Sequence, residues 1–185
     1  MNRKLYSILA ALLIAVLSTS SVLAGGNIKL SASITSGSPL HLVGTLTGLG
    51  GYPEGVTVTL TGFGTVLSVT CTNPQGRQAP GQNPGRITVG GFQEIGLDQI
   101  DTHGRAEVDF SAGEPLLPGA CPNGKWTASF VVAWEKAEVF VYDNRYPFLA
   151  DNWLLKQVYQ PCTPNIPGDP NSGYTCPLFS NESGH

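Results

Sequence analysis

This chain of 185 residues is poor in charge, in histidine and in methionine. Charged side chains make up only 12% of the sequence, about half the share that is usual in globular proteins. Ten Lys and Arg stand against thirteen Asp and Glu, which gives a net charge of −3. This mildly acidic balance excludes a nucleic-acid surface, because such a surface needs clustered basic side chains.

Several motifs that would carry chemistry are also missing. The four cysteines and three histidines show no Cys-x-x-Cys or His-x-x-x-His spacing, which argues against zinc. There is no G-x-S-x-G nucleophile motif and no calcium-loop spacing. We therefore expect a non-catalytic protein without a metal or cofactor. Calcium at two pairs of nearby acids, Asp98 with Asp101 and Asp143 with Asp151, stays open as an alternative.

Two histidines remain as candidates for a catalytic base. His41 follows Pro39 closely, and His103 directly precedes Gly104 in a segment that is typical of a turn. A solvated histidine is the ordinary state at such positions, so we predict that neither is catalytic. A hydrolase that the motifs do not reveal is the alternative from another class of function.

The first 24 residues have the pattern of a secretory signal. A cationic start at Arg3 and Lys4 is followed by an apolar run over residues 8–17 and by a small-residue end at Ala24. The apolar run is shorter than the roughly 20 residues that a membrane span requires. We expect residues 1–24 to be removed, and a secreted chain without a membrane span that is extracellular or held at the cell surface.

An even number of cysteines in a secreted chain predicts two disulfides, although four cysteines allow three connectivities. Cys162 and Cys176 lie in one short proline-rich segment, so we favour that pair and, with it, Cys71 with Cys121. Residues 161–185 show almost no alternation, which predicts an irregular tail tied by the second bridge.

Most of the sequence between these segments alternates between apolar and polar residues, as strands do. The alternating segments are 27–35, 40–48, 54–62, 65–71, 86–93, 104–112, 125–144 and 153–160. About eight short strands in residues 25–160 predict one antiparallel β-sandwich domain.

Two details of the alternation make local predictions. Leu67, Val69 and Cys71 share one parity, so Cys71 should point into the core at a strand end. In the segment 125–144 the apolar phase slips by one residue, which predicts a bulge or a corner near Lys136.

The glycine- and proline-rich loop over residues 70–85 resembles a ligand cradle only superficially. Gly76 and Gly81 have the spacing of a P-loop, but Gln82 and Asn83 occupy the positions where Lys and Ser or Thr would bind phosphate and magnesium. We therefore predict that these glycines set turn dihedrals.

The segments TCTNPQG at 70–76 and ACPNGKWTASF at 120–130, with GTLTGLG at 44–50 upstream, resemble a group of small secreted bacterial proteins. Those proteins consist of a signal peptide and one immunoglobulin-like β-sandwich. The resemblance covers about residues 27–160. It implies an immunoglobulin-like fold and a disulfide between Cys71 and Cys121, and it implies no function.

Aromatic side chains are the remaining candidates for binding. Trp126 and Trp134 share the phase of apolar neighbours and are predicted to lie in the core. Tyr146, Phe148 and Trp153 surround the turn before the last predicted strand and form a candidate exposed patch. We expect a module that acts by surface contact, for adhesion or at the envelope, on a protein or glycan partner. Carbohydrate binding by these three aromatics is the alternative.

The sequence N-E-S, which begins at Asn181, fits the acceptor pattern for glycosylation. Whether this site is used depends on the host, so glycosylation at Asn181 stays open.

Overall fold

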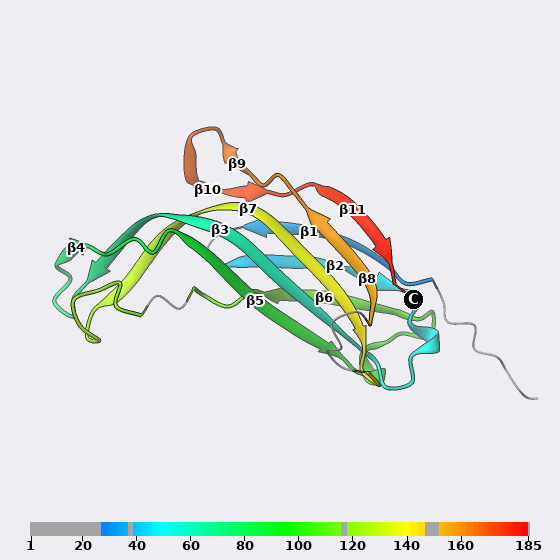
Figure 1. The fold of residues 1–185 in the computed structure, drawn as a ribbon. Coiled ribbons are helices and arrows are strands. Elements are labelled where there is room, and N and C mark those ends of the chain that lie inside the picture. The colour runs from blue at the N-terminus through cyan, green and yellow to red at the C-terminus, as the bar shows by residue number, and fades with distance from the viewer. Residues whose placement is uncertain (1–26, 37–38, 116–117, 147–151, 185) are drawn as a thin grey trace, which may run out of the picture.

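The computed structural model describes residues 27–36, 39–115, 118–146 and 152–184, which form two antiparallel sheets packed as a β-sandwich (Figure 1). The all-β sandwich predicted from the sequence is confirmed, whereas its immunoglobulin-like character stays a prediction. Among the residues described, no helix has the length and apolar character to cross a membrane.

The five-stranded sheet has the order β6-β2-β1-β10-β9. Its strands are β1 (Lys29–Ser36), β2 (Leu40–Thr47), β6 (Arg105–Ser111), β9 (Thr163–Ile166) and β10 (Asp169–Thr175). The six-stranded sheet has the order β11-β8-β7-β3-β4, with β5 also paired to β3. Its strands are β3 (Val56–Thr72), β4 (Gln78–Pro80), β5 (Arg86–Ile95), β7 (Thr127–Asp143), β8 (Trp153–Tyr159) and β11 (Leu178–Ser183). Two single-turn 3-10 helices, η1 (Leu49–Gly51) and η2 (Leu97–Gln99), connect strands.

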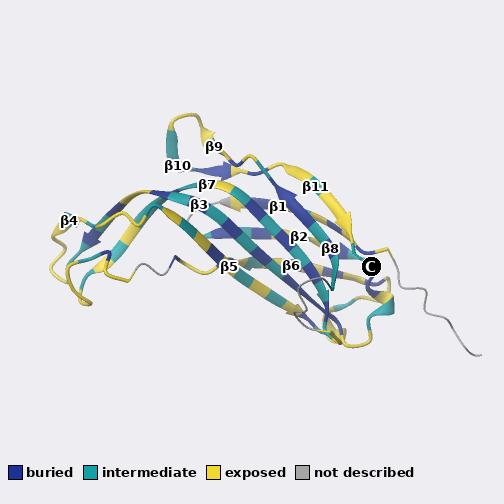
Figure 2. Cartoon of the chain, in the orientation of Figure 1, coloured by how far each residue is buried: buried dark blue, intermediate teal, exposed yellow. Residues whose placement is uncertain are grey.

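The core lies between the sheets and follows the predicted alternation. Leu30 and Ile34 of β1 and Val108 of β6 are buried, whereas the residues directly before and after each of them are exposed. Figure 2 shows the same alternation of buried and accessible positions along β3 and β7. Each strand of this kind places one set of side chains in the core and leaves the other for the outer face.

The bulge predicted near Lys136 is confirmed, and it falls at the preceding residue. Phe63 pairs with Lys136, but the next residue of β3 pairs with Trp134, so Glu135 is the extra residue. The bulge shifts the phase of β7 by one. As a result Trp134 before it and Ala137 after it both lie in the core.

A second bulge changes the orientation of Leu67. Val66 pairs with Val132 and Ser68 with Val131, so Leu67 is the extra residue of β3. Leu67 is 49% exposed, and Val66 is buried instead. Parity had placed Leu67 on the same face of the sheet as Cys71. A bulge shifts the alternation by one residue, so residues of the same parity on its two sides no longer share a face.

The expectation of an irregular tail after residue 160 is corrected by the structure. Three strands follow Gln160: β10 pairs with β1, β9 pairs with β10, and β11 pairs with β8. Prolines do not prevent this, since an edge strand tolerates a missing N–H that would face solvent. The C-terminal segment thus contributes strands to both sheets.

Both disulfides join the cysteines that the sequence analysis paired, Cys71 with Cys121 and Cys162 with Cys176. Cys71 is fully buried at the end of β3 where β4 begins to pair. A Cβ added to Gly81 would lie 2.8 Å from the sulfur of Cys71. Gly81 therefore serves the close packing of the loop on this disulfide, and residues 70–85 form a β3–β4 hairpin rather than a cradle.

The two sheets are joined along one side by β5 and β6. The Gln93 side chain donates to the Glu107 carbonyl (3.3 Å) and accepts from the Asp109 N–H (2.9 Å). The Gly113 N–H donates to the Gly90 carbonyl at 2.9 Å. This side of the sandwich is closed by hydrogen bonds between the edge strands.

A buried polar pair joins the sheets elsewhere. Gln157 of β8 donates from Nε2 to the carbonyl of Leu30 in β1 (2.9 Å), and its Oε1 accepts from the Tyr159 hydroxyl (2.7 Å). Gln157 and Tyr159 are both buried. Satisfied hydrogen bonds of this kind compensate the cost of burying polar groups.

We expect the Tyr159 phenol to make stability fall at high pH. Burial raises the pKa of Tyr159 to about 12, so the folded protein retains a proton that the unfolded chain loses near pH 10. Its contribution is complete below pH of about 10 and is lost as pH rises toward about 12. Urea denaturation across this range should show a shallower fall for Tyr159→Phe. Tyr146→Phe, at an exposed site, is the control, and parallel pH profiles for wild type and Tyr159→Phe would contradict the assignment.

Candidate functional site: an aromatic sheet face

Five aromatic side chains share the outer face of the six-stranded sheet. We call this surface the aromatic face; it consists of Phe63, Phe92, Phe140, Tyr142 and Trp153, from strands β3, β5, β7 and β8. The strands bring them together because residues opposite each other in register point to the same face.

The register arranges these residues in rows across the sheet. In one row Thr59 of β3 lies between Phe92 of β5 and Phe140 of β7. In the next row Tyr142 lies between Thr57 of β3 and Trp153 of β8. In both rows a hydroxyl-bearing threonine of β3 therefore lies beside aromatic rings of neighbouring strands.

Ring contacts order part of this face. The Phe140 and Tyr142 rings lie 6.0 Å apart between centroids and are stacked with an interplanar angle of 23°. Phe92 is 62% exposed, whereas the other four rings are partly covered. Stacking and partial cover fix the rings without burying them, which suits a preformed contact surface.

Two lysines lie over rings of the aromatic face. The ammonium of Lys136 is 4.5 Å from the centroid of Phe63 and 2.9 Å from the Glu138 carboxylate. The ammonium of Lys156 is 5.8 Å from the centroid of Phe140. These cation–π contacts place charged hydrogen-bond donors at the margin of the apolar rings.

Threonines on β3 run between the aromatic columns. Thr57, Thr59 and Thr61 occupy successive outward positions of the strand. Thr57 is buried and donates to Asn144 Oδ1 at 2.7 Å. Thr59 and Thr61 are partly exposed, so their hydroxyls can both donate to and accept from a ligand.

The structure describes two of the three aromatics predicted to form a patch, so that patch stays a prediction. Trp153 belongs to the aromatic face beside Tyr142. Tyr146 lies in the turn after β7, where it is 53% exposed and its ring centroid is 5.7 Å from the Arg145 guanidinium. Phe148 lies outside the described residues. Of the tryptophans assigned to the core, Trp134 is buried and Trp126 is partly buried against the core.

Asp143, considered above for calcium, is bound by Arg145. The guanidinium Nε lies 3.1 and 3.0 Å from the two carboxylate oxygens of Asp143, which also accepts from the Arg145 N–H at 2.9 Å. Burial raises the pKa of Asp143, but the hydrogen bonds and charge of Arg145 outweigh it and hold that pKa below its ordinary value. This pair fixes the turn that ends β7.

Asp101, another candidate acid, also has structural partners. Asp101 Oδ1 accepts from the backbone N–H groups of His103 and Arg105, both at 2.8 Å, which orders the turn before β6. Asp151 lies outside the described residues. Within the described ranges, no group of three or more His, Cys, Asp or Glu side chains has the arrangement to hold a metal ion.

Both ring nitrogens of His41 have side-chain partners, unlike those of a histidine that is only solvated. Its Nδ1 lies 2.9 Å from Ser111 Oγ, and its Nε2 lies 3.0 Å from Asp109 Oδ1. These are the residue types of a hydrolytic triad. The Asp109 side chain is 68% exposed, however, so solvent screens its charge, and the cluster lies on the outer face of the five-stranded sheet. We assign it to cross-strand stabilisation of β2 and β6.

Neither a protein family nor a curated protein matches this chain. The fold and the surface thus define its class: a β-sandwich with two disulfides and an aromatic outer face.

Proposed function

We propose that the protein is a non-catalytic, exported module that acts by surface contact, and that the aromatic face binds carbohydrate. The observation that supports this proposal is the alignment of Phe92, Thr59 and Phe140 in one row across three strands, with Tyr142 and Trp153 in the next. An adhesion or envelope-associated role is the broader form of the same proposal.

The chemistry of the face matches that of a sugar chain. Pyranose rings present flat C–H faces that pack against aromatic rings, and their hydroxyls need donors and acceptors nearby. Phe92 and Phe140 supply the apolar surface, whereas Thr59, Thr61 and Lys156 supply hydrogen bonds at its margin. Sites that combine aromatic surface with a few placed polar groups are typical of ligand recognition.

Two features support an extracellular place for this activity. Disulfides form and persist in oxidising environments, and this chain has two. Residues 1–24 have the pattern of a secretory signal. An exported chain would meet glycans of a cell wall or a host surface, which makes polysaccharide a suitable ligand class.

Removing rings from the aromatic face should weaken polysaccharide binding. We expect the double variant Phe92→Ala/Phe140→Ala to lose at least about tenfold in affinity, which corresponds to about 1.4 kcal/mol. Affinity electrophoresis and calorimetry on a panel of cell-wall and host polysaccharides measure this effect. Phe179→Ala is the matched control, because Phe179 is 67% exposed but lies on β11, away from these rows.

Four other results would contradict parts of the proposal. Equal affinities for wild type and the double variant would exclude the aromatic face, and Tyr146→Ala would then test the turn. Retention on protein-bearing but not on polysaccharide fractions would exclude carbohydrate, and retention on no cell-wall or host-surface fraction would exclude surface contact. Release of sugar or acyl products that His41→Ala abolishes would show an enzyme.

A further inference from the structure

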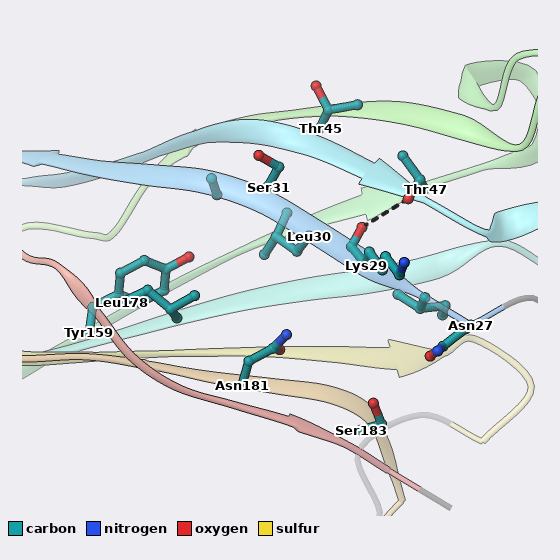
Figure 3. Close-up of a pocket in the computed structure, with 12 residues that line it drawn as sticks. Asn27, Lys29, Leu30, Ser31, Thr45, Thr47, Tyr159, Leu178, Asn181 and Ser183 are labelled. Carbon is teal, nitrogen blue, oxygen red and sulfur yellow. Dashed lines mark hydrogen bonds between the residues drawn. The ribbon is translucent and has the colours of Figure 1, made fainter.

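The sandwich is closed on the β5–β6 side, whereas the side between β1 and β11 is open. A cavity of about 550 Å³ lies there. In Figure 3 residues of β1 line one wall, and Asn181 and Ser183 of β11 line the other. Its volume is in the range of small-ligand sites.

The wall formed by β1 is a free strand edge. Along β1 the backbone groups of alternate residues point to opposite sides, and the carbonyl of Leu30 faces Gln157 rather than β2. The N–H groups of Leu30 and Ala32 therefore also face away from β2. Among the described strands, only β10 pairs with this edge of β1, and the register joins them at Thr35 and Thr175 alone.

The wall formed by β11 is a second free edge. The Gly184 N–H donates to the carbonyl of Leu154, at the start of β8. By the same alternation, Asn181 and Ser183 turn their backbone groups away from β8 and toward the cavity. The Leu30 carbonyl is taken by Gln157, but the N–H groups of Leu30 and Ala32 and the backbone groups of Asn181 and Ser183 face each other across one groove.

We propose that this groove binds one extended segment of a partner polypeptide, which pairs with β1 as an added strand. A polypeptide backbone is the ligand whose donors and acceptors repeat at the spacing of a strand edge. Among the described residues that line the groove, Lys29 is the charged one, so the segment carries an acidic side chain close to it.

The probe is the peptide acetyl-Thr-Val-Thr-Val-Asp-Thr-amide, followed by amide hydrogen exchange in the exported chain. Saturating peptide should slow exchange at Leu30 and Ala32 by at least about tenfold and leave the β2-paired amides of Ser31 and Ser33 unchanged. Lys29→Glu should weaken this protection. In that variant, the same peptide with Lys in place of Asp should protect these amides more strongly than the original peptide does.

The control peptide has identical side chains but N-methyl groups on two adjacent residues, so that neither of its edges can pair. Equal protection by the control peptide would overturn strand addition. To remove weak affinity as a reason for failure, the probe is also fused to Asn27 through a flexible glycine linker, which raises its effective concentration to about millimolar. Absence of protection at Leu30 and Ala32 in the fusion would overturn the proposal.

Discussion

Replacing Cys71 and Cys121 together by alanine is expected to lower the free energy of unfolding by about 4 kcal/mol. The bridge closes 50 residues of chain, and the chain-entropy model gives about this value for such a loop. Because domains have only about 5–15 kcal/mol in total, the variant should be marginally stable. Urea denaturation of oxidised wild type and of the variant measures the difference.

The second bridge supplies a matched comparison. Cys162→Ala/Cys176→Ala opens a loop of 14 residues, for which the same model predicts about 3 kcal/mol. Cys71 is fully buried and packs on Gly81, so its loss also leaves a gap. We therefore expect the Cys71–Cys121 bridge to contribute more to the free energy of unfolding. A larger loss on removing the Cys162–Cys176 bridge would contradict loop length and packing as the causes.

Trp134→Ala is expected to lower the free energy of unfolding by about 3–5 kcal/mol, the usual effect of truncating a large core aromatic. Trp134 is 2% exposed. Its ring packs on the backbone of β3, since Cβ atoms added at Gly62 and Gly64 would lie 3.1 and 3.0 Å from ring carbons. A Cβ at Gly64 would also lie 2.8 Å from the carbonyl oxygen of Ala133, so a larger side chain there could not refill the space without displacing the backbone. Thermal and urea unfolding measure the loss.

Trp153→Ala is the control for this prediction. It removes the same side chain from the accessible outer face of the sheet, where less area is buried, and should cost less than half as much. Equal losses for both variants would show that Trp134 does not anchor the core.

Alternation along the sequence was enough to predict the sandwich. In β1 and β6 every second residue is apolar, and those residues are buried or partly buried. The phase slip near Lys136 located the β7 bulge to within one residue. Parity failed at Leu67 because the β3 bulge depends on how Val66 and Ser68 pair with β7, which no local pattern records.

The strands of the C-terminal segment were missed for a different reason. Residues of β9, β10 and β11 have little alternation, and two of these strands lie at sheet edges. Such strands form because β1 and β8 offer backbone partners, so tertiary pairing rather than local propensity decides them.

The aromatic face was missed although part of its signal is local. Phe140 and Tyr142 alternate with the buried Val139 and Val141, which places them on the opposite, outer face. That Phe92 lies in the same row as Phe140 follows only from the pairing of β5 and β7 with β3. A pattern along the chain can show which residues face outward, but their neighbours across a sheet come from the register.

The pairing of β3 with β7 also decides when the molecule can fold. These two 17-residue strands form the centre of the six-stranded sheet, and their register joins Thr72 to Thr127 at one end and Val56 to Asp143 at the other. Every one of these contacts requires a long intervening loop to close first, which places the chain among slow folders, on a scale of about milliseconds to seconds. Until residue 143 has emerged from the ribosome, β3 keeps an unpaired, threonine-rich edge. The chain is therefore most exposed to aggregation before its folding begins, while it is still being synthesised.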